Sequence, residues 1–320
     1  MSRAIGVALD IDGVLLKGKQ VLPVAKQALE LLIQHKIPYI FMTNNGGVSE
    51  VNKALDLSEK FGIEVPSRQV LLSHTPMRSL VPSLAHSPVL ILGSANCMDI
   101  AREYGFGNTY STNMMHAMYP DIFPSLKPKE VLGRPSPSSI QLKDFKAILN
   151  FHDPQDWALD LQIASDIILS QALSSASIPY YACNPDMVYP ASYPRPRYTQ
   201  GAFNECLRSL LKKSFDFELK ISYFGKPNLV QYEFAENMLH WEANLLKKAP
   251  PTRYYGIGDN PKADIRGANN AGKAWKSVLV KTGIFQPPTG VLNDATDPAH
   301  FVVEDIFEAV ALIVRQHDRD

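Results

Sequence analysis

The stretch from Ile5 to Leu16, IGVALDIDGVLL, constrains the fold of this chain more than any other. Its uncharged run, Ile5 to Leu9, is typical of a strand buried on both faces of a parallel sheet. Asp10 and Asp12 follow directly, and residues two apart on an extended chain share a face. Ligands bind at the carboxyl ends of strands in open α/β sheets. Two carboxylates at such an edge need a cation, a shared proton or a nearby lysine.

Three later apolar runs also end in polar residues. They are Pro38 to Met42 before Thr43 and Asn44, Ile221 to Phe224 before Lys226, and Tyr254 to Ile257 before Asp259, with Asp264 five residues on. Helical patterns separate the runs; one spans Glu50 to Phe61, with Ser49 as its N-cap and Gly62 at its end. Alternating strands and helices predict an α/β fold with a Rossmann-like parallel sheet, whose carboxyl edge gathers these polar residues.

Prolines become frequent after Ser73, and further strand candidates, such as Val89 to Leu92, indicate a second sheet. The segment Asp121 to Ser139 is proline-rich and is expected to be a surface excursion. The segment YPASYPRPRYTQG has three closely spaced prolines, which stiffen the backbone and suit a domain crossing. The sequence therefore predicts a discontinuous core domain, residues 1–75 and 198–320, and an inserted α/β domain, residues 76–197.

Composition excludes several classes of protein. The 320 residues carry 32 Lys plus Arg and 32 Asp plus Glu, which does not favour a broad nucleic-acid-binding surface. Three widely separated cysteines predict neither a disulfide framework nor a zinc site. No apolar run approaches the ~20 residues that span a bilayer. No arginine-rich presequence precedes Asp10, so the cytosol is expected unless a targeting segment is missing from this chain.

Four ordered motifs resemble those of the haloacid dehalogenase (HAD) superfamily of phosphohydrolases. They are DIDGV, the TNN that begins at Thr43, the FGKP that contains Lys226, and GDNPKAD, which begins at Gly258. The insertion between the second and third motifs is similar to the C2 cap of the class IIA, NagD-like branch. The segments FMTNN, LLSHTP, HDPQDW and CNPD resemble the cat eye syndrome critical region protein group of mitochondrial hydrolases. The resemblance extends along essentially the whole chain.

The resemblance implies a HAD fold with an inserted C2-type cap and an Mg²⁺-dependent phosphatase activity. It also implies a mitochondrial location and a link to glycerophospholipid biosynthesis. The expected partner is a small phosphorylated substrate, and a homodimer is left open. One departure concerns the fourth motif, since Asn260 and Ala263 stand where many NagD-like enzymes have arginine and threonine.

Chemistry and resemblance together predict roles for the acidic residues. A carboxylate can act as the nucleophile in phosphoryl transfer, and Asp10 is the expected nucleophile. Asp12 is expected to protonate the leaving oxygen and then to accept a proton from water. Asp10, Asp259 and the backbone carbonyl of Asp12 are expected to hold Mg²⁺, which prefers oxygen ligands. Asp264 is expected to support this site rather than to bind the metal directly.

The remaining predicted site residues would bind the substrate. The Thr43 hydroxyl and the Asn44 backbone N–H are expected to hold phosphoryl oxygens, and Lys226 to offset the negative charge. In the inserted domain, Asn184 and Asp186 match the family segment that faces the active site, although Asn-Pro-Asp is also a common turn.

Three other functions compete with a phosphatase. A halide-displacing enzyme is disfavoured, because by the family pattern it lacks the second aspartate and the metal. A phosphate beside two carboxylates does need a cation, since each like-charged pair repels by ~4 kcal/mol at 4 Å and an effective dielectric of 20. A phosphomutase and a catalytically quiet binding protein with the HAD fold both remain open.

Overall fold

The computed structural model describes residues 4–129, 140–172, 177–189, 193 and 195–317. Residues 130–139 of the predicted proline-rich excursion lie outside the described residues, as do residues 190–192 and 194 of the predicted domain crossing. The chain forms two compact units. Unit 1 comprises Met1–Asn45, Ser49–Thr75 and Gly225–Asp320, and unit 2 comprises Gly46–Val48 and Pro76–Phe224.

Unit 1 is built on a six-stranded sheet with strand order β15-β14-β13-β1-β4-β5, in which every neighbouring pair is parallel. Its strands are β1 (Ile5–Leu9), β4 (Tyr39–Met42), β5 (Val70–Leu71), β13 (Arg253–Gly258), β14 (Trp275–Val280) and β15 (Phe301–Val303). A small hairpin joins β2 (Leu16–Lys17) to β3 (Gln20–Val21). The helical elements are α1 (Ala25–Gln34), α2 (Glu50–Phe61), η1 (Ser67–Gln69), α8 (Leu229–Leu245), η6 (Pro261–Ile265), α9 (Arg266–Asn270) and α10 (Ile306–His317).

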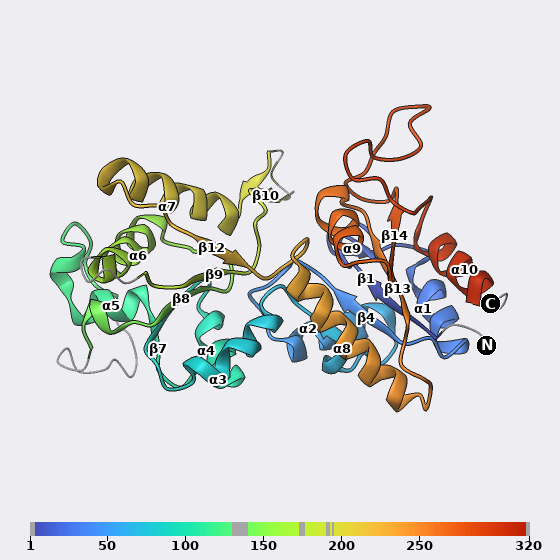
Figure 1. The fold of residues 1–320 in the computed structure, drawn as a ribbon, viewed down its shortest axis with the longest axis horizontal. Helices are drawn as coiled ribbons and strands as arrows, with labels where there is room; N and C mark the ends of the chain where they lie inside the picture. The colour runs from blue at the N-terminus through green and yellow to red at the C-terminus, as the bar shows by residue number, and fades with distance from the viewer. Residues whose placement is uncertain (1–3, 130–139, 173–176, 190–192, 194, 318–320) are drawn as a thin grey trace. The chain divides into compact units, whose positions relative to one another are not determined.

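Helices cover both faces of this sheet (Figure 1). Tyr232 of α8 and Ala268 of α9 pack in one buried cluster with Ala8 and Tyr254. The next residue on β13, Tyr255, donates its hydroxyl to Gln316 of α10 at 2.8 Å. Because neighbouring residues of a strand point to opposite faces, α10 covers the other side. The sheet is therefore buried on both faces, as its continuous apolar strands predict.

Unit 2 contains a second parallel sheet of five strands, ordered β12-β9-β8-β6-β7. Its strands are β6 (Val89–Leu92), β7 (Thr109–Ser111), β8 (Ala147–Asn150), β9 (Tyr180–Ala182) and β12 (Ile221–Tyr223), with a separate pair, β10 (Val188–Tyr189) and β11 (Arg197–Tyr198). The helical elements are η2 (Thr75–Leu80), α3 (Val81–Leu84), α4 (Asn96–Tyr104), α5 (Thr112–Met118), η3 (Pro120–Ile122), η5 (Leu142–Asp144), α6 (Trp157–Ala172) and α7 (Gln200–Phe215).

The structure corrects the second predicted domain boundary. Residues 198–224 belong to unit 2, so the chain returns to unit 1 at Gly225 rather than at residue 198. The reason is that β12 pairs with β9, and that Phe203 and Leu207 of α7 pack in the unit 2 core. The apolar run before Lys226 is therefore an edge strand of the inserted sheet and not a strand of the core sheet.

Helix α2 illustrates how local sequence sets the element ends. The Ser49 hydroxyl accepts a hydrogen bond from the Asn52 N–H at 3.3 Å, and Gly62 ends the helix with φ +64°. Both predicted caps are confirmed, because a serine oxygen satisfies a free N–H and glycine tolerates the left-handed conformation. None of the helices in the described residues is long and apolar enough to cross a membrane.

Candidate active site

The carboxyl edge of the unit 1 sheet brings Asp10 and Asp259 together. Leu9 of β1 lies opposite Ile257 of β13, and the Asp10 N–H donates to the Ile257 carbonyl at 2.9 Å. Both aspartates therefore leave adjacent parallel strands at the same edge, as the strand pattern predicts. Both side chains are buried.

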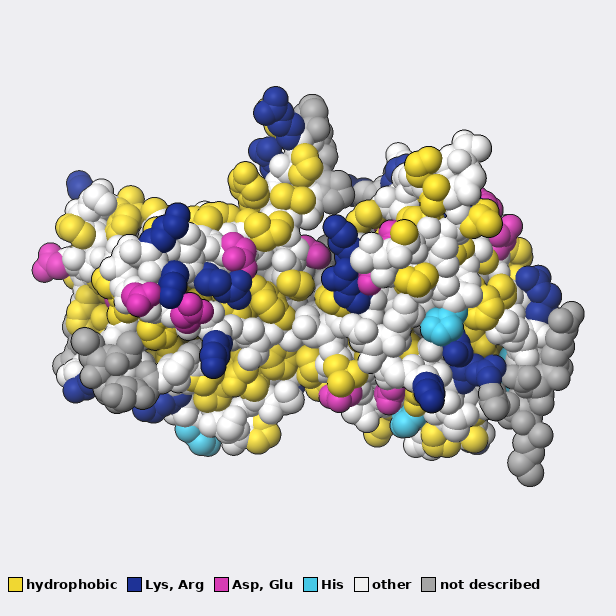
Figure 2. All heavy atoms as spheres, turned by 45° about the horizontal axis from the view of Figure 1, so that its top comes forward, with side chains coloured by type: hydrophobic (Ala, Val, Ile, Leu, Met, Phe, Trp, Pro, Cys, Tyr) yellow, Lys and Arg dark blue, Asp and Glu magenta, His cyan; other side chains and the backbone are white. Residues whose placement is uncertain are grey.

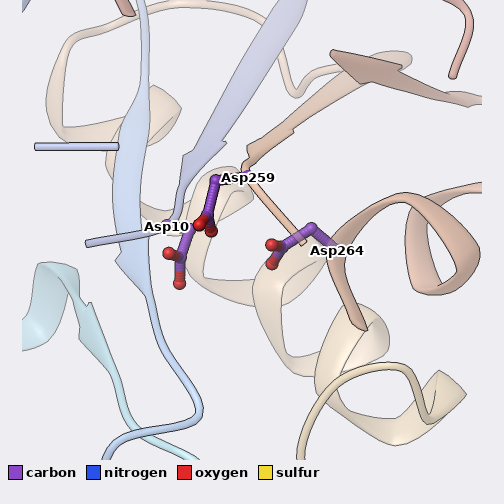
Figure 3. A group of neighbouring side chains, drawn as sticks. All are labelled: Asp10, Asp259 and Asp264. Carbon is purple, nitrogen blue, oxygen red and sulfur yellow. The ribbon is translucent and has the colours of Figure 1, made fainter. Parts of the chain in front are cut away.

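A third carboxylate completes a cluster with them. Asp10, Asp259 and Asp264 each have one carboxylate oxygen within 4.8 Å of the other two (Figure 3). Asp264 reaches the cluster from η6, the short π-helical turn that follows β13. Three buried carboxylates in one place are unfavourable unless positive charge offsets them.

Lys226 supplies one positive charge to this cluster. Its ammonium lies 2.6 Å from Oδ1 of Asp10 and 2.6 Å from Oδ1 of Asp264, and it donates to the Met42 carbonyl at 3.0 Å. The side chain is 2% exposed, so these contacts are screened little by water. All three ammonium protons are engaged, which fixes the position of the charge. Among the described residues, no hydrogen bond reaches Oδ2 of Asp10.

One ammonium does not neutralise three carboxylates, and both burial and the neighbouring carboxylates act on the pKa values of Asp10 and Asp259. Burial raises the pKa of Asp10 well above its ordinary value; Lys226 opposes this shift, while Asp264 and Asp259 add to it. Burial alone would lower the pKa of Lys226, but Asp10 and Asp264 outweigh it and hold that pKa above its usual range. Burial, together with Asp264, raises the pKa of Asp259 to about 7. A divalent cation among these oxygens would remove this imbalance.

A loop that was not predicted orients Asp259. The Ile284 N–H donates to Oδ2 of Asp259 at 2.6 Å, and the Phe285 N–H donates to its backbone carbonyl at 3.0 Å. A Cβ on Gly283 would lie 1.9 Å from the same Oδ2, so only glycine allows this approach. The loop follows β14, and ligands bind at the carboxyl ends of parallel strands, so the position of the loop at such an end could have identified it from the sequence.

The Asn44 side chain holds the Lys226 backbone, which is a contact that the sequence did not predict. Its Oδ1 accepts from the Lys226 N–H at 2.8 Å, and its Nδ2 donates to the Lys226 carbonyl at 2.9 Å. This pair joins the end of β4 to a segment 182 residues later in the chain. These contacts involve the side-chain amide of Asn44. The predicted binding of a phosphoryl oxygen by the backbone N–H of Asn44 stays a prediction.

Thr43 and Asp12 occupy the same edge of the sheet. Thr43 is buried, and its Oγ1 accepts from the Asn45 N–H at 3.0 Å, a bond that does not use the hydroxyl proton. Asp12 is exposed and lies where the chain turns into the β2–β3 hairpin, since the Gly13 N–H donates to the Leu16 carbonyl at 2.7 Å. An exposed carboxyl group at this edge can exchange protons with water.

Asp264 has the contacts of a supporting residue. Its Oδ2 accepts from the Asn260 N–H at 3.0 Å, and its Oδ1 accepts from Lys226. The buried Tyr232 hydroxyl donates to its backbone carbonyl at 3.0 Å. With both carboxylate oxygens engaged, Asp264 is suited to holding Lys226 in place.

The two predicted residues of the inserted domain lie in unit 2. Oδ1 of Asn184 accepts from the Asp186 N–H at 2.8 Å, which is the geometry of an Asx turn. The Asp186 carbonyl accepts from the Gly201 N–H at 3.1 Å. Both contacts hold the turn together, and a substrate role for these residues stays a prediction.

Comparison with known proteins identifies related families and sequences. A family model described as haloacid dehalogenase-like hydrolase matches residues 7–107, and a HAD-hydrolase-like model matches residues 223–309. A mitochondrial hydrolase of Saccharomyces cerevisiae is 34% identical, over 99% of this chain and 97% of the yeast protein. A cardiolipin synthase (CMP-forming)/mitochondrial hydrolase fusion protein of Schizosaccharomyces pombe is 31% identical, over 96% of this chain and 52% of the fusion protein. The chain thus spans about half of the fusion protein.

Solved structures share the fold at low sequence identity. A hypothetical protein from Pyrococcus horikoshii superposes with a TM-score of 0.73 at 19% identity, covering 97% of this chain and 99% of that one. A p-nitrophenyl phosphatase from Archaeoglobus fulgidus superposes with a TM-score of 0.68 at 17% identity, covering 98% and 100%. The predicted α/β fold with an inserted domain is therefore confirmed along nearly the whole chain.

Proposed function

Because the chain belongs to the haloacid dehalogenase-like hydrolases, we propose that it is a phosphatase that hydrolyses phosphate monoesters through a phosphorylated Asp10. The observation that carries this proposal is the contact of Asp10 with Lys226 at 2.6 Å in a buried cluster of carboxylates. A phosphatase must hold a nucleophile and a dianionic phosphate together, and this arrangement supplies the nucleophile with a fixed positive charge beside it.

In the first step, a carboxylate oxygen of Asp10 attacks phosphorus and the bond from phosphorus to the ester oxygen breaks. Asp12 donates its proton to the departing oxygen, so an alcohol leaves and an aspartyl phosphate remains. Oδ2 of Asp10 suits the attack, since Lys226 already occupies Oδ1. The exposed position of Asp12 suits a group that must exchange protons with substrate and water.

In the second step, water attacks phosphorus and gives a proton to the Asp12 carboxylate. The bond between phosphorus and the Asp10 oxygen breaks, which releases inorganic phosphate and restores the Asp10 carboxylate. Lys226 faces the charge that develops on Asp10 and the phosphoryl group. Thr43 donates its hydroxyl proton to a phosphoryl oxygen, and the Asn44 backbone N–H donates to another.

The donor set fits Mg²⁺. Asp10, Asp259 and the backbone carbonyl of Asp12 would hold the ion, and Asp264 would support them; all these donors are oxygens, which Mg²⁺ prefers. When bound, the ion would offset the repulsion between the phosphate and the carboxylates. The raised pKa values of Asp10 and Asp259 are consistent with this assignment, because burial and the neighbouring carboxylates both disfavour their charged forms, and a bound cation would favour them.

The substrate is proposed to be a small phosphorylated metabolite, selected by unit 2 with contributions from Asn184 and Asp186. The names of the two yeast relatives support a mitochondrial location, and the fused cardiolipin synthase supports a link to glycerophospholipid metabolism.

The test measures release of inorganic phosphate from p-nitrophenyl phosphate and from a panel of phosphorylated metabolites. Release should require Mg²⁺, stop on chelation, and vanish in Asp10→Asn. The exposed Asp99 of unit 2 provides a control, since Asp99→Asn makes the same change far from the cluster in sequence and should retain activity. Full turnover by Asp10→Asn would reject the mechanism.

Movement of phosphate between two positions of one substrate would instead indicate a phosphomutase. If no phosphate is released and beryllofluoride with Mg²⁺ does not stabilise the fold, the chain is a binding protein.

A further inference from the structure

A cavity of about 280 Å³ lies in unit 1, at the amino ends of the core strands. Tyr39 is the first residue of β4 and Gln69 directly precedes β5, and both line the cavity. Asp10 and Asp259 follow the carboxyl ends of β1 and β13, at the opposite edge of the same sheet. The cavity is therefore separate from the candidate active site. Its volume is close to the lower limit for sites that bind small molecules, ~300 Å³.

Apolar side chains form much of the cavity wall. They are Leu32 near the end of α1, Leu246 directly after α8, and Ile37, Pro38 and Pro66 from the segments that lead into β4 and β5. A ligand with an apolar body fits such a wall, because its apolar surface leaves water on binding.

The Tyr39 hydroxyl is an unused hydrogen-bonding group of this cavity. Tyr39 is 6% exposed, and among the described residues its hydroxyl has no hydrogen-bond partner. Burial, together with the Glu242 carboxylate, raises the pKa of Tyr39 to about 12, so the hydroxyl keeps its proton. Because buried polar groups in proteins normally have a partner, this hydroxyl is suited to a ligand that accepts its proton.

Arg68 supplies positive charge beside Tyr39 and Glu242. Its Nε donates to Oε1 of Glu242 at 2.9 Å, and Gln69 donates to Oε2 at 3.2 Å, so both carboxylate oxygens are engaged. The Glu242 side chain is 5% exposed, whereas that of Arg68 is 50% exposed. Within the described part of the chain, no acceptor contacts Nη1 or Nη2 of Arg68. The outer nitrogens of a guanidinium held in this way match the two oxygens of a carboxylate.

The charges around the cavity are balanced. Lys36 and Glu64 also line it, and both are exposed. Figure 2 shows the same mixture of acidic and cationic side chains on both units. A dianion such as phosphate would be repelled by Glu242 and Glu64, with no broad cationic surface among the described residues of the cavity to offset them. A singly charged anion is the better match.

We propose that this cavity binds a small carboxylate with an apolar body. The outer nitrogens of Arg68 hold the carboxylate oxygens, and the Tyr39 hydroxyl donates to one of them. The apolar part lies against the wall formed by the ends of α1 and α8. An ammonium ligand is disfavoured, because both oxygens of Glu242 already accept hydrogen bonds. This binding does not depend on the proposed phosphatase activity.

The test is isothermal titration calorimetry of the full chain with octanoate, octylamine and 1-octanol, three probes that share one alkyl chain. Octanoate should bind at least about tenfold more tightly than the other two, since its hydrogen bonds are charge-assisted. Tyr39→Phe should weaken octanoate binding about tenfold without lowering the unfolding temperature, because the hydroxyl has no partner to lose. Arg68→Gln with Glu242→Gln removes both charges of the pair together, and this variant should bind octanoate no better than 1-octanol.

Matched controls lie in unit 2. Tyr110→Phe changes another tyrosine that is 6% exposed, and Arg102→Gln with Asp99→Asn removes another ion pair. Both controls should bind octanoate like the unchanged protein. The proposal is overturned if octanoate does not bind, or if octylamine or 1-octanol binds as tightly. It is also overturned if the cavity variants bind octanoate like the unchanged protein, or if the controls lose as much affinity as they do.

Discussion

The side-chain amide of Asn44 forms two hydrogen bonds with the backbone of Lys226: it accepts from the N–H at 2.8 Å and donates to the carbonyl at 2.9 Å. Through this pair the end of β4 fixes the segment that brings the Lys226 ammonium to Asp10. Since β12 belongs to the other sheet, the strand that precedes Lys226 does not place the Lys226 backbone at the edge of the core sheet. The two hydrogen bonds of the Asn44 amide hold the Lys226 backbone there instead.

Replacing Asn44 by alanine should therefore misplace Lys226. We expect kcat for p-nitrophenyl phosphate to fall by about tenfold to a hundredfold, because a small displacement of a catalytic group is costly. The free energy of unfolding should fall by ~1–3 kcal/mol, because two backbone groups lose their partners. Asn45→Ala is the matched control, since Asn45 is the exposed neighbour. Equal losses in both variants would show that the Asn44 amide has no special role.

Lys226→Met should destabilise the fold by ~3–5 kcal/mol near neutral pH, because it leaves buried carboxylates without their cation. At about pH 5 the loss should be smaller, because burial already raises the pKa of Asp10 and protonation then removes its charge. Urea unfolding at both pH values measures this difference. A loss that is the same at both values would contradict the charge-balance account.

Gly283→Ala should disturb Asp259, since the added Cβ would lie 1.9 Å from Oδ2. We expect the Mg²⁺ concentration for half-maximal activity to rise at least about tenfold, as is typical when the support of a metal ligand is lost. Gly290→Ala is the control, because its Cβ would meet no atom within 4 Å, although its φ of +89° is strained. It should lower stability without changing the Mg²⁺ requirement.

Asp160 should make the stability depend on pH. Burial raises its pKa to about 6, while hydrogen bonds from the Thr112 hydroxyl at 2.5 Å and the Asp156 N–H oppose that rise. A carboxyl group with a raised folded-state pKa gives its full stabilisation below the ordinary value of ~3.9 and loses it as pH rises through about 6. The free energy of unfolding, compared with that of Asp160→Asn, should therefore decline by ~3 kcal/mol over this range. Parallel pH curves for the two proteins would contradict this.

Much of unit 1 follows from the sequence because parallel strands align their carboxyl ends. The apolar run before Asp10 and the run before Asp259 both lie in the core sheet, so their polar ends meet. The run before Lys226 has the same pattern but joins the inserted sheet. An apolar run indicates that a strand is buried, but it does not identify the strand that pairs with it, so the sequence could not show which sheet this run joins.

The missed contacts share another cause. Each of them joins a side chain to a backbone group far away in sequence: the Asn44 amide to the Lys226 backbone, and the Asp259 carboxylate to the Ile284 N–H. The Thr282 hydroxyl, for example, donates to the Gly13 carbonyl at 2.5 Å across 269 residues of sequence. Residue type alone does not specify such partners, because any backbone carbonyl or N–H can serve.

The most direct test of the account is to identify the residue that carries phosphate during turnover. The protein is mixed with p-nitrophenyl phosphate and Mg²⁺, quenched in acid and reduced with borohydride, which converts an aspartyl phosphate to homoserine. Peptide mass spectrometry then locates the modified residue. The account predicts homoserine at position 10, dependent on substrate and absent from Lys226→Met. Phosphate release without modification at position 10, or with modification at another carboxylate, would contradict it.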